Sequence, residues 1–171
     1  AGGIAQSLIS MLKPFNCHIT VVRNREGDVP GADVVLTTSR LHEALKDADA
    51  VLMAIALTPH TQGIMGKAEF QSMQSHAWIV NVGRGKQIVT DDLVWAPETG
   101  EIGGAALDVT DPEPLPTGHP LWSLPNCIIT PHVGNTAEMV PPLLALRIAE
   151  NVRRFAAGEQ LIGIVDRTVG Y

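Results

Sequence analysis

Three ionisable side chains, Arg84, Glu113 and His132, each lie shortly after a short apolar run of the chain. A carboxylate bonded to one imidazole nitrogen fixes the histidine tautomer and favours imidazolium, so the other nitrogen can deliver a proton near neutral pH. An arginine between two glycines presents a planar fork suited to a carboxylate or a polarised carbonyl. Together the three predict a proton-transfer site, although each one alone is also typical of a solvated or structural residue.

The runs before these residues have the length and the small or β-branched composition of strands buried on both faces of a parallel sheet. In open α/β sheets, ligands bind in the crevice beyond the carboxyl ends of the strands, where all three side chains would lie. Apolar runs alternate with helical spacing, which predicts a doubly wound α/β fold in three αβα layers. We expect strands at residues 19–22, 33–36, 50–57, 77–82, 105–107 and 127–130. We expect helices at residues 4–12, 41–48, 67–73, 90–95 and 141–157, the fourth ended by Pro97 and the fifth with core spacing.

The chain opens with Gly2, Gly3 and Ile4, which fit the end of a phosphate-binding turn, G-x-G-x-x-G/A, whose first glycine precedes residue 1. The helix that follows offers free N–H groups and about half a positive charge to a phosphate. Two terminal glycines are equally typical of a tag remnant. Because the chain begins inside this turn and without Met, we expect it to be a piece of a longer protein.

The strand at 19–22 is followed by Arg23, Asn24 and Arg25. In a dinucleotide-binding unit this strand ends in Asp or Glu when the ribose hydroxyls of NAD are bound. A guanidinium instead pairs bidentately with a 2′-phosphate, so the sequence favours NADP as cofactor, with NAD as the alternative. The simpler interpretation is a loop with two solvated arginines.

The composition is that of a globular protein, with 45% hydrophobic residues and a formal net charge of −6. This charge argues against a nucleic-acid partner, because phosphate binding needs a basic stripe. No apolar run approaches the about 20 residues of a membrane span and no signal peptide is visible, so we expect no membrane partner. We interpret Cys17 and Cys127 as buried free thiols, which favours a cytoplasmic location, and two cysteines are too few for a zinc site.

Several segments carry motifs in one characteristic order: residues 58–61, 79–85, 103–109, 111–115, 119–122, 129–132, 151–155 and the final residues 165–171. On these motifs the chain resembles the cofactor-binding domain of the D-isomer-specific 2-hydroxyacid dehydrogenases. The resemblance implies a Rossmann-type fold in which Arg84 anchors a 2-oxo acid, Glu113 orients and charges His132, and His132 is the general acid/base. It also implies that Asp108 holds the nicotinamide amide. Further cofactor contacts are implied for Leu57, Thr58, Thr61, Val82, Gly83, Arg84, His132 and Gly134.

On this resemblance we expect an NADPH-preferring, D-isomer-specific reductase of small 2-oxo acids, such as glyoxylate or hydroxypyruvate, that forms a homodimer. Residues 1–150 would form the dinucleotide-binding domain, and residues 151–171 a tail that returns to a substrate domain absent from this chain. The chain alone would then be inactive and bind only nucleotide. A dinucleotide-sensing, corepressor-like interaction protein is the competing class. Gly83 departs from the family, in which Ala is common at this position.

Overall fold

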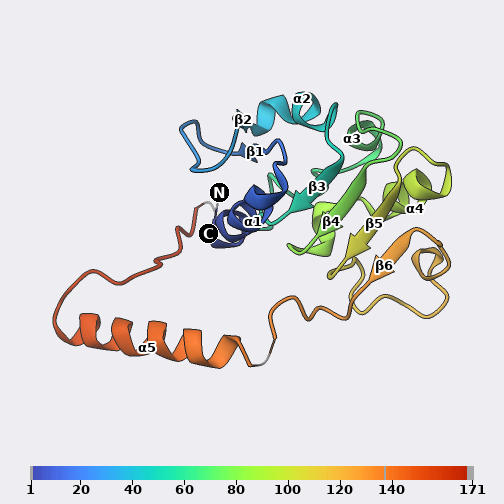
Figure 1. Ribbon diagram of the computed structural model, residues 1–171. Helices are drawn as coiled ribbons and strands as arrows, with labels where there is room; N and C mark the ends of the chain where they lie inside the picture. Colours follow the sequence, from blue (N-terminus) through green and yellow to red (C-terminus); the bar gives the residue numbers. More distant parts are fainter. Residues whose placement is uncertain (1, 137, 169–171) are drawn as a thin grey trace.

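The computed structural model describes residues 2–136 and 138–168 and contains two parallel ladders (Figure 1). In the first, β1 (Thr20–Arg23) pairs with β2 (Val34–Thr37). The second has the order β3-β4-β5-β6, and these strands cover Ala50–Met53, Trp78–Asn81, Gly104–Leu107 and Cys127–Ile129. Within the described chain no strand pairs with both β1 and β3, so the two ladders stay separate.

Five α-helices connect or follow these strands over the described residues. They are α1 (Gly3–Leu12), α2 (Leu41–Leu45), α3 (Lys67–Phe70), α4 (Thr90–Glu98) and α5 (Val140–Ala156). Every ladder pairing is parallel, so within each ladder the carboxyl ends of the strands lie at one edge. A parallel sheet flanked by helices confirms the predicted α/β class, and the sheet edge gathers the residues that follow the strands.

The main core lies around the four-stranded ladder. Its central strand β4 contributes Ile79, which is fully buried, and Phe70 of α3 and Leu93 of α4 pack into the same cluster. Every residue of β4 and β5 is buried or half-buried, as expected of strands that are covered on both faces. The first ladder is smaller, and its buried residues include Leu36 on β2.

Several predicted boundaries are wrong: α2 ends at Leu45 and α3 at Phe70, each before its predicted end. Helix α4 continues through Pro97 to Glu98 and does not stop at residue 95. Pro97 lies in the last turn, where the missing N–H removes one bond just before the helix ends. Strand β3 ends at Met53 and not at residue 57, because the peptide carbonyls of Ile55 and Ala56 accept side-chain hydrogen bonds instead of joining a ladder.

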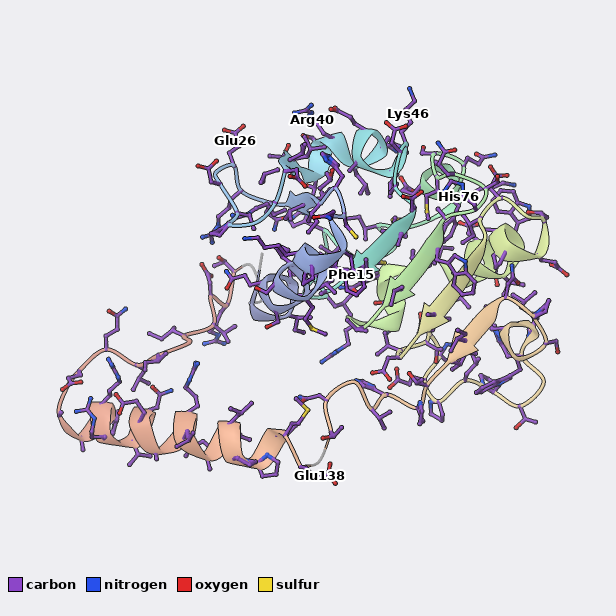
Figure 2. All side chains as sticks on the ribbon, in the orientation of Figure 1. Phe15, Glu26, Arg40, Lys46, His76 and Glu138 are labelled. Carbon is purple, nitrogen blue, oxygen red and sulfur yellow. The ribbon has the colours of Figure 1, made fainter. Side chains whose placement is uncertain are left out.

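The predicted burial of Cys17 is also wrong, because this side chain is exposed just before β1. Cys127 on β6 is half-buried, and burial raises the pKa of its thiol to about 11. The cysteines are both free. Exposed side chains cover the outside of the domain, and Phe15 beside α1 is one of the largest apolar examples (Figure 2).

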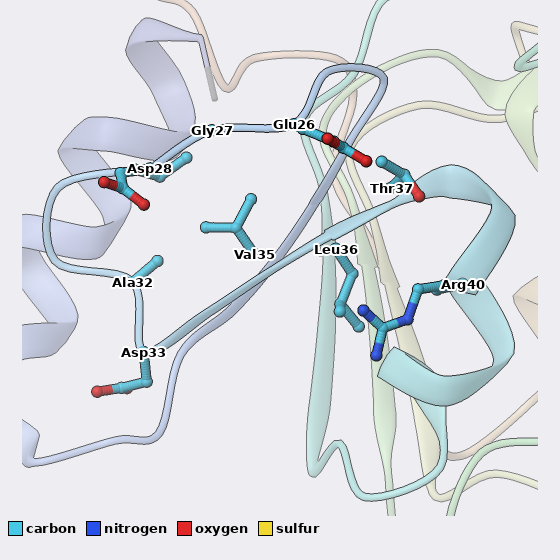
Figure 3. Close-up of a pocket in the computed structure, with 10 residues that line it drawn as sticks. Glu26, Gly27, Asp28, Ala32, Asp33, Val35, Leu36, Thr37 and Arg40 are labelled. Carbon is cyan, nitrogen blue, oxygen red and sulfur yellow. The ribbon is translucent and has the colours of Figure 1, made fainter.

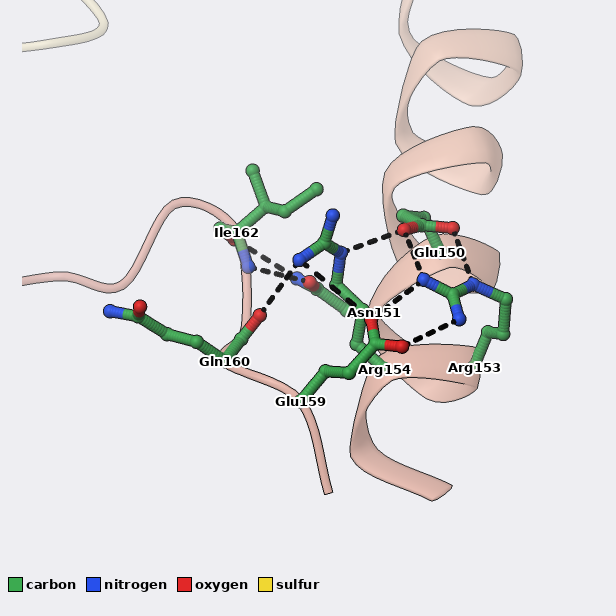
Figure 4. A network of polar contacts seen from close by, with 7 residues as sticks. All are labelled: Glu150, Asn151, Arg153, Arg154, Glu159, Gln160 and Ile162. Carbon is green, nitrogen blue, oxygen red and sulfur yellow. Dashed lines mark hydrogen bonds and ion pairs between the residues drawn. The ribbon is translucent and has the colours of Figure 1, made fainter. Parts of the chain in front are cut away.

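Helix α5 extends away from the ladders, and none of its residues is buried (Figure 1). The predicted core role of its apolar face is therefore wrong within the described structure. The exposed apolar side chains of α5 are Leu143, Leu144, Leu146, Ile148, Val152 and Phe155. The segment after the helix folds back on it, where Asn151 exchanges two hydrogen bonds with the backbone of Ile162 (Figure 4). The expected domain division between residues 150 and 151 falls inside this helix.

Candidate active site

Glu113 and His132 form a hydrogen-bonded pair at the carboxyl edge of the four-stranded ladder. Oε1 of Glu113 lies 2.5 Å from Nδ1 of His132. The hydrogen bond to His132 is the main cause that lowers the pKa of the Glu113 carboxyl; a bond from the Thr110 amide and the charge of Arg84 act in the same direction, against burial. Both side chains are partly open to solvent. This geometry fixes the imidazole by one nitrogen and leaves Nε2 without a hydrogen-bond partner among the described residues.

Asp108 holds the segment that carries His132. Its Oδ1 accepts hydrogen bonds from the Thr130 hydroxyl at 2.6 Å and the Val133 amide at 2.9 Å, and its Oδ2 accepts one from the Gly134 amide at 2.8 Å. Burial opposes the charge of Asp108, but these three bonds and His132 outweigh it and lower the pKa of the carboxyl. The backbone of His132 has a φ of 55°, which a non-glycine residue adopts only when its surroundings impose it. Asp108 bonds on both sides of that strained residue.

Gly134 is required for this arrangement. A Cβ at position 134 would lie 2.8 Å from Oδ2 of Asp108, which is closer than van der Waals contact allows. Only glycine therefore lets the loop approach the carboxylate closely enough to donate its amide. The sequence interpretation assigned both residues to cofactor binding, and the geometry adds a local role in shaping the His132 loop.

Arg84 lies in the turn that follows β4. Gly85 permits the neighbouring loop to approach this turn, since a Cβ there would lie 1.9 Å from the carbonyl oxygen of Thr110. That loop carries Glu113, and the Arg84 charge acts on the Glu113 carboxyl. The structure thus brings the regions of Arg84, Glu113 and His132 together, as the order of strands predicts.

The other residues predicted to bind a dinucleotide lie, in chain order, at the start of α1, at the end of β1, between β3 and β4, and directly after β4. Gly2, Gly3 and Ile4 form the start of α1, where Gly2 precedes the helix and a Cβ at either glycine would meet open space. The first amides of a helix have no intrahelical acceptors, so this end can bind an anion. Arg23 is the last residue of β1, and Asn24 and Arg25 follow it in an exposed loop.

The third place is the segment between β3 and β4. Leu57 is half-buried, and Thr58 and Thr61 are buried and bonded to each other's backbone or hydroxyl. The Thr61 hydroxyl also donates to the Ala56 carbonyl at 2.7 Å, which gives this loop a fixed shape. Val82 and Gly83 follow β4 beside it, with Val82 exposed and Gly83 buried.

Two buried residues of this region were missed from the sequence: Asn81 and Gln87 are fully buried polar side chains that hydrogen-bond around Arg84. The sequence marks them only weakly: Asn81 is a polar residue at the end of an apolar run, and Gln87 is a polar residue after a glycine-rich turn. His42, which no sequence motif singles out, lies with its Nδ1 2.7 Å from the Ser72 hydroxyl.

A pocket of about 470 Å³ lies elsewhere, along the first ladder (Figure 3). Its lining includes Glu26, Asp28, Asp33 and Arg40, and none of the acid–base residues takes part. This pocket is lined by residues 26–40 and is therefore separate from Arg84, Glu113 and His132, which lie after β4, β5 and β6. Within residues 2–136 and 138–168 no cluster of three or more His, Cys, Asp or Glu side chains has the arrangement of a metal site.

The fold and these side chains define a parallel α/β domain with a hydrogen-bonded Glu–His pair at its sheet edge. The family model of the D-isomer specific 2-hydroxyacid dehydrogenases, NAD binding domain, matches residues 1–134, and the chain belongs to this family. An uncharacterised protein of Corynebacterium melassecola is 44% identical over 100% of this chain and 56% of its own length. The human glyoxylate reductase/hydroxypyruvate reductase is 35% identical over 94% of this chain and 49% of its own length.

Solved structures show the same relationship. The NADPH-dependent glyoxylate/hydroxypyruvate reductase of Sinorhizobium meliloti, in complex with NADP and sulfate, matches with a TM-score of 0.91 and 27% identity. The match covers 99% of this chain and 54% of that one. The chain thus spans about half the length of the curated relatives that it matches. Among the helices described here, none has the length and apolar character needed to cross a membrane.

Proposed function

We propose that the complete gene product reduces a small 2-oxo acid, with glyoxylate and hydroxypyruvate as the first candidates, and uses NADPH as the hydride donor. The observation that carries this proposal is the Glu113–His132 hydrogen bond beside the Arg84 turn. Membership of the family supports it, as do relatives named glyoxylate/hydroxypyruvate reductases. The product would be the D-isomer wherever the reduced carbon becomes chiral, as the family description states.

The residues at the start of the chain fit a dinucleotide. The first amides of α1 have no intrahelical acceptors, and a Cβ at Gly2 or Gly3 would meet open space, so a pyrophosphate can approach this end of the helix closely. Arg23 ends β1, where a carboxylate would hold the ribose of NAD, and its guanidinium suits a 2′-phosphate. The structure of the Sinorhizobium meliloti relative in complex with NADP supports the same choice. We therefore place NADP first and NAD second.

When bound, NADPH supplies the hydride that reaches the carbonyl carbon. Arg84 holds the carboxylate of the 2-oxo acid and offsets the negative charge that develops on the carbonyl oxygen. His132 gives its Nε2 proton to that oxygen, and Glu113, bonded to Nδ1, fixes the orientation of the ring. Asp108 holds the His132 loop and, in this proposal, also lies near the nicotinamide amide. Thr58, Thr61 and Leu57 would contact the dinucleotide from the neighbouring loop.

The test is the loss of absorbance at 340 nm when the complete gene product is mixed with NADPH and glyoxylate or hydroxypyruvate. Turnover with NADPH supports the proposal, and faster turnover with NADH would correct its cofactor. Tight binding of NADPH without reduction of any 2-oxo acid would favour a dinucleotide-sensing interaction protein instead. The 171-residue chain alone is expected to bind NADPH and to show no turnover, because relatives are about twice as long.

We further propose that the complete gene product is a cytoplasmic homodimer without a nucleic-acid partner. Free cysteines and a net charge of −6 support the location and the absence of nucleic acid. Trp122, which is exposed in the proline-rich loop, supports a protein contact there. Residues 151–171 are proposed to return to the substrate domain. Light scattering coupled to size-exclusion chromatography would measure the mass, and a monomeric mass would contradict the dimer.

A further inference from the structure

Gln87 has a fully buried polar side chain, and both ends of its amide form hydrogen bonds at the carboxyl edge of the sheet. Its Oε1 accepts a hydrogen bond from the Arg84 backbone amide at 2.9 Å. Its Nε2 donates to the carbonyl of Ile55 at 2.8 Å, on the segment that leads from β3 into the Thr58 loop. One side chain therefore joins the turn of the substrate arginine to the loop of the dinucleotide site.

Asn81 holds the same arginine from the other side. Its Nδ2 donates to the Arg84 carbonyl at 3.0 Å, and its Oδ1 accepts from the Gly83 amide at 2.9 Å. Asn81 is also fully buried. Both backbone polar groups of Arg84 are thus bonded to buried side chains, while its own side chain stays exposed. Such bonds are costly to break, because a buried donor or acceptor then loses its partner.

The small residue at position 83 belongs to the same arrangement. A Cβ at Gly83 would lie 2.3 Å from Oε1 of Gln87 and 3.1 Å from the carbonyl oxygen of Ile55. The Gln87 amide therefore occupies the space that a methyl group at position 83 would need. Glycine at 83 and glutamine at 87 therefore go together.

We propose that Gln87 is a positioning residue for Arg84, which it holds against the dinucleotide loop, and that Gly83 is glycine to make room for it. This inference rests on the proposed function, because it assigns Arg84 to the substrate carboxylate. A bidentate contact between an arginine and a carboxylate tolerates little displacement, so the backbone under the arginine must be fixed. Gln87 fixes it without touching substrate or cofactor.

The first experiment measures amide hydrogen exchange at Arg84 by NMR in the 171-residue chain. Gln87→Met keeps the length of the side chain and removes both hydrogen bonds, so exchange at Arg84 should speed up by about five- to ten-fold. Gln87→Glu should keep more protection, since a neutral buried carboxyl can still accept from Arg84 and donate to Ile55. The control Ile79→Val lowers core stability in β4 without touching Arg84. Unchanged exchange at Arg84 in folded Gln87→Met would overturn the proposal.

If Gln87→Met does not fold, Gly83→Ala provides the second test. Its methyl group displaces Oε1 of Gln87, so exchange at Arg84 should rise in this variant as well. The double variant Gly83→Ala/Gln87→Ala should recover stability relative to Gly83→Ala, because the side-chain end that meets the methyl group is removed, but it should not recover protection of Arg84. Wild-type protection in either variant would contradict the role of Gln87.

The second experiment uses the complete gene product. Gln87→Met should raise the KM for glyoxylate and lower kcat/KM by about ten- to hundred-fold. Gln87→Glu should restore part of the loss, and Ile79→Val should leave KM unchanged. A KM equal to that of the wild type would overturn the positioning role. If the wild type reduces no 2-oxo acid, the proposed function fails, while the exchange at Arg84 still decides whether Gln87 holds it.

Discussion

Nδ1 of His132 lies 2.5 Å from Oε1 of Glu113, although the two residues are 19 positions apart and follow different strands. The contact exists because β5 and β6 are adjacent and parallel, so the segments after both strands leave the sheet at one edge. Asp108, the first residue after β5, bonds to the segment after β6 and completes the link. The contact between Glu113 and His132 is therefore a direct product of the strand order.

Replacing His132 by Ala should remove the proton donor and leave the dinucleotide contacts of α1 and β1 intact. General acid catalysis contributes about 10²–10⁴-fold in rate, so kcat with glyoxylate should fall at least that much in the complete gene product. The affinity for NADPH, measured by fluorescence titration, should change little. Turnover equal to the wild type would exclude His132 as the general acid.

Replacing His132 by Gln should raise the pKa of the Glu113 carboxyl toward its ordinary value of 4.5, because the hydrogen bond to His132 is the main cause that lowers it. A carboxyl with a lowered pKa stabilises the folded state above the ordinary pKa, and that contribution is lost as the pH falls through the lowered value. The stability difference between wild type and variant should therefore shrink on acidification below about pH 4.5. Carboxyl ¹³C NMR titration of Glu113 in the wild type and in His132→Gln measures the two pKa values, and equal values would contradict the pair.

Replacing Asp108 by Asn should loosen the His132 loop. An amide offers one acceptor oxygen in place of two, so at least one of the Thr130, Val133 and Gly134 donors loses its partner. We expect the free energy of unfolding to fall by about 1–2 kcal/mol, measured by urea denaturation of the 171-residue chain. The same chemical change at Asp111, in the neighbouring loop, is the control. Equal effects at the two positions would argue against a specific role for Asp108.

Replacing Arg23 by Ser should weaken the binding of NADPH by about ten- to hundred-fold and leave the binding of NADH unchanged, because a charge-assisted bond to the 2′-phosphate is lost. Fluorescence titration of the 171-residue chain measures both constants. Arg153→Ser is the matched control, since Arg153 lies on α5 and is paired with Glu150 and Glu159. A parallel loss of both affinities would show that Arg23 acts on something other than the 2′-phosphate.

Much of the fold and part of the site follow from the sequence. Buried strands that read as unbroken apolar runs predict β4, β5 and β6, and the residues after them predict the acid–base pair. Gln87 could not be predicted, because its role depends on the Ile55 carbonyl, 32 positions away, and on the space beside Gly83. The exposed face of α5 could not be predicted either, because periodicity shows which side of a helix is apolar and not whether anything covers it.

No strand pairing joins β1 to β3 among the described residues, so the two ladders should differ in their stability against local unfolding. A two-stranded ladder alone is marginal, whereas four strands over a shared core resist opening. Native-state hydrogen exchange should therefore find Val21 and Val35 released by local fluctuations while Ile79 and Ala105 require global unfolding. Uniform exchange across all six strands would show that one cooperative unit spans both ladders. Arg23 lies on β1, in the less stable two-stranded ladder. A 2′-phosphate bound to Arg23 would therefore also stabilise this ladder against local unfolding.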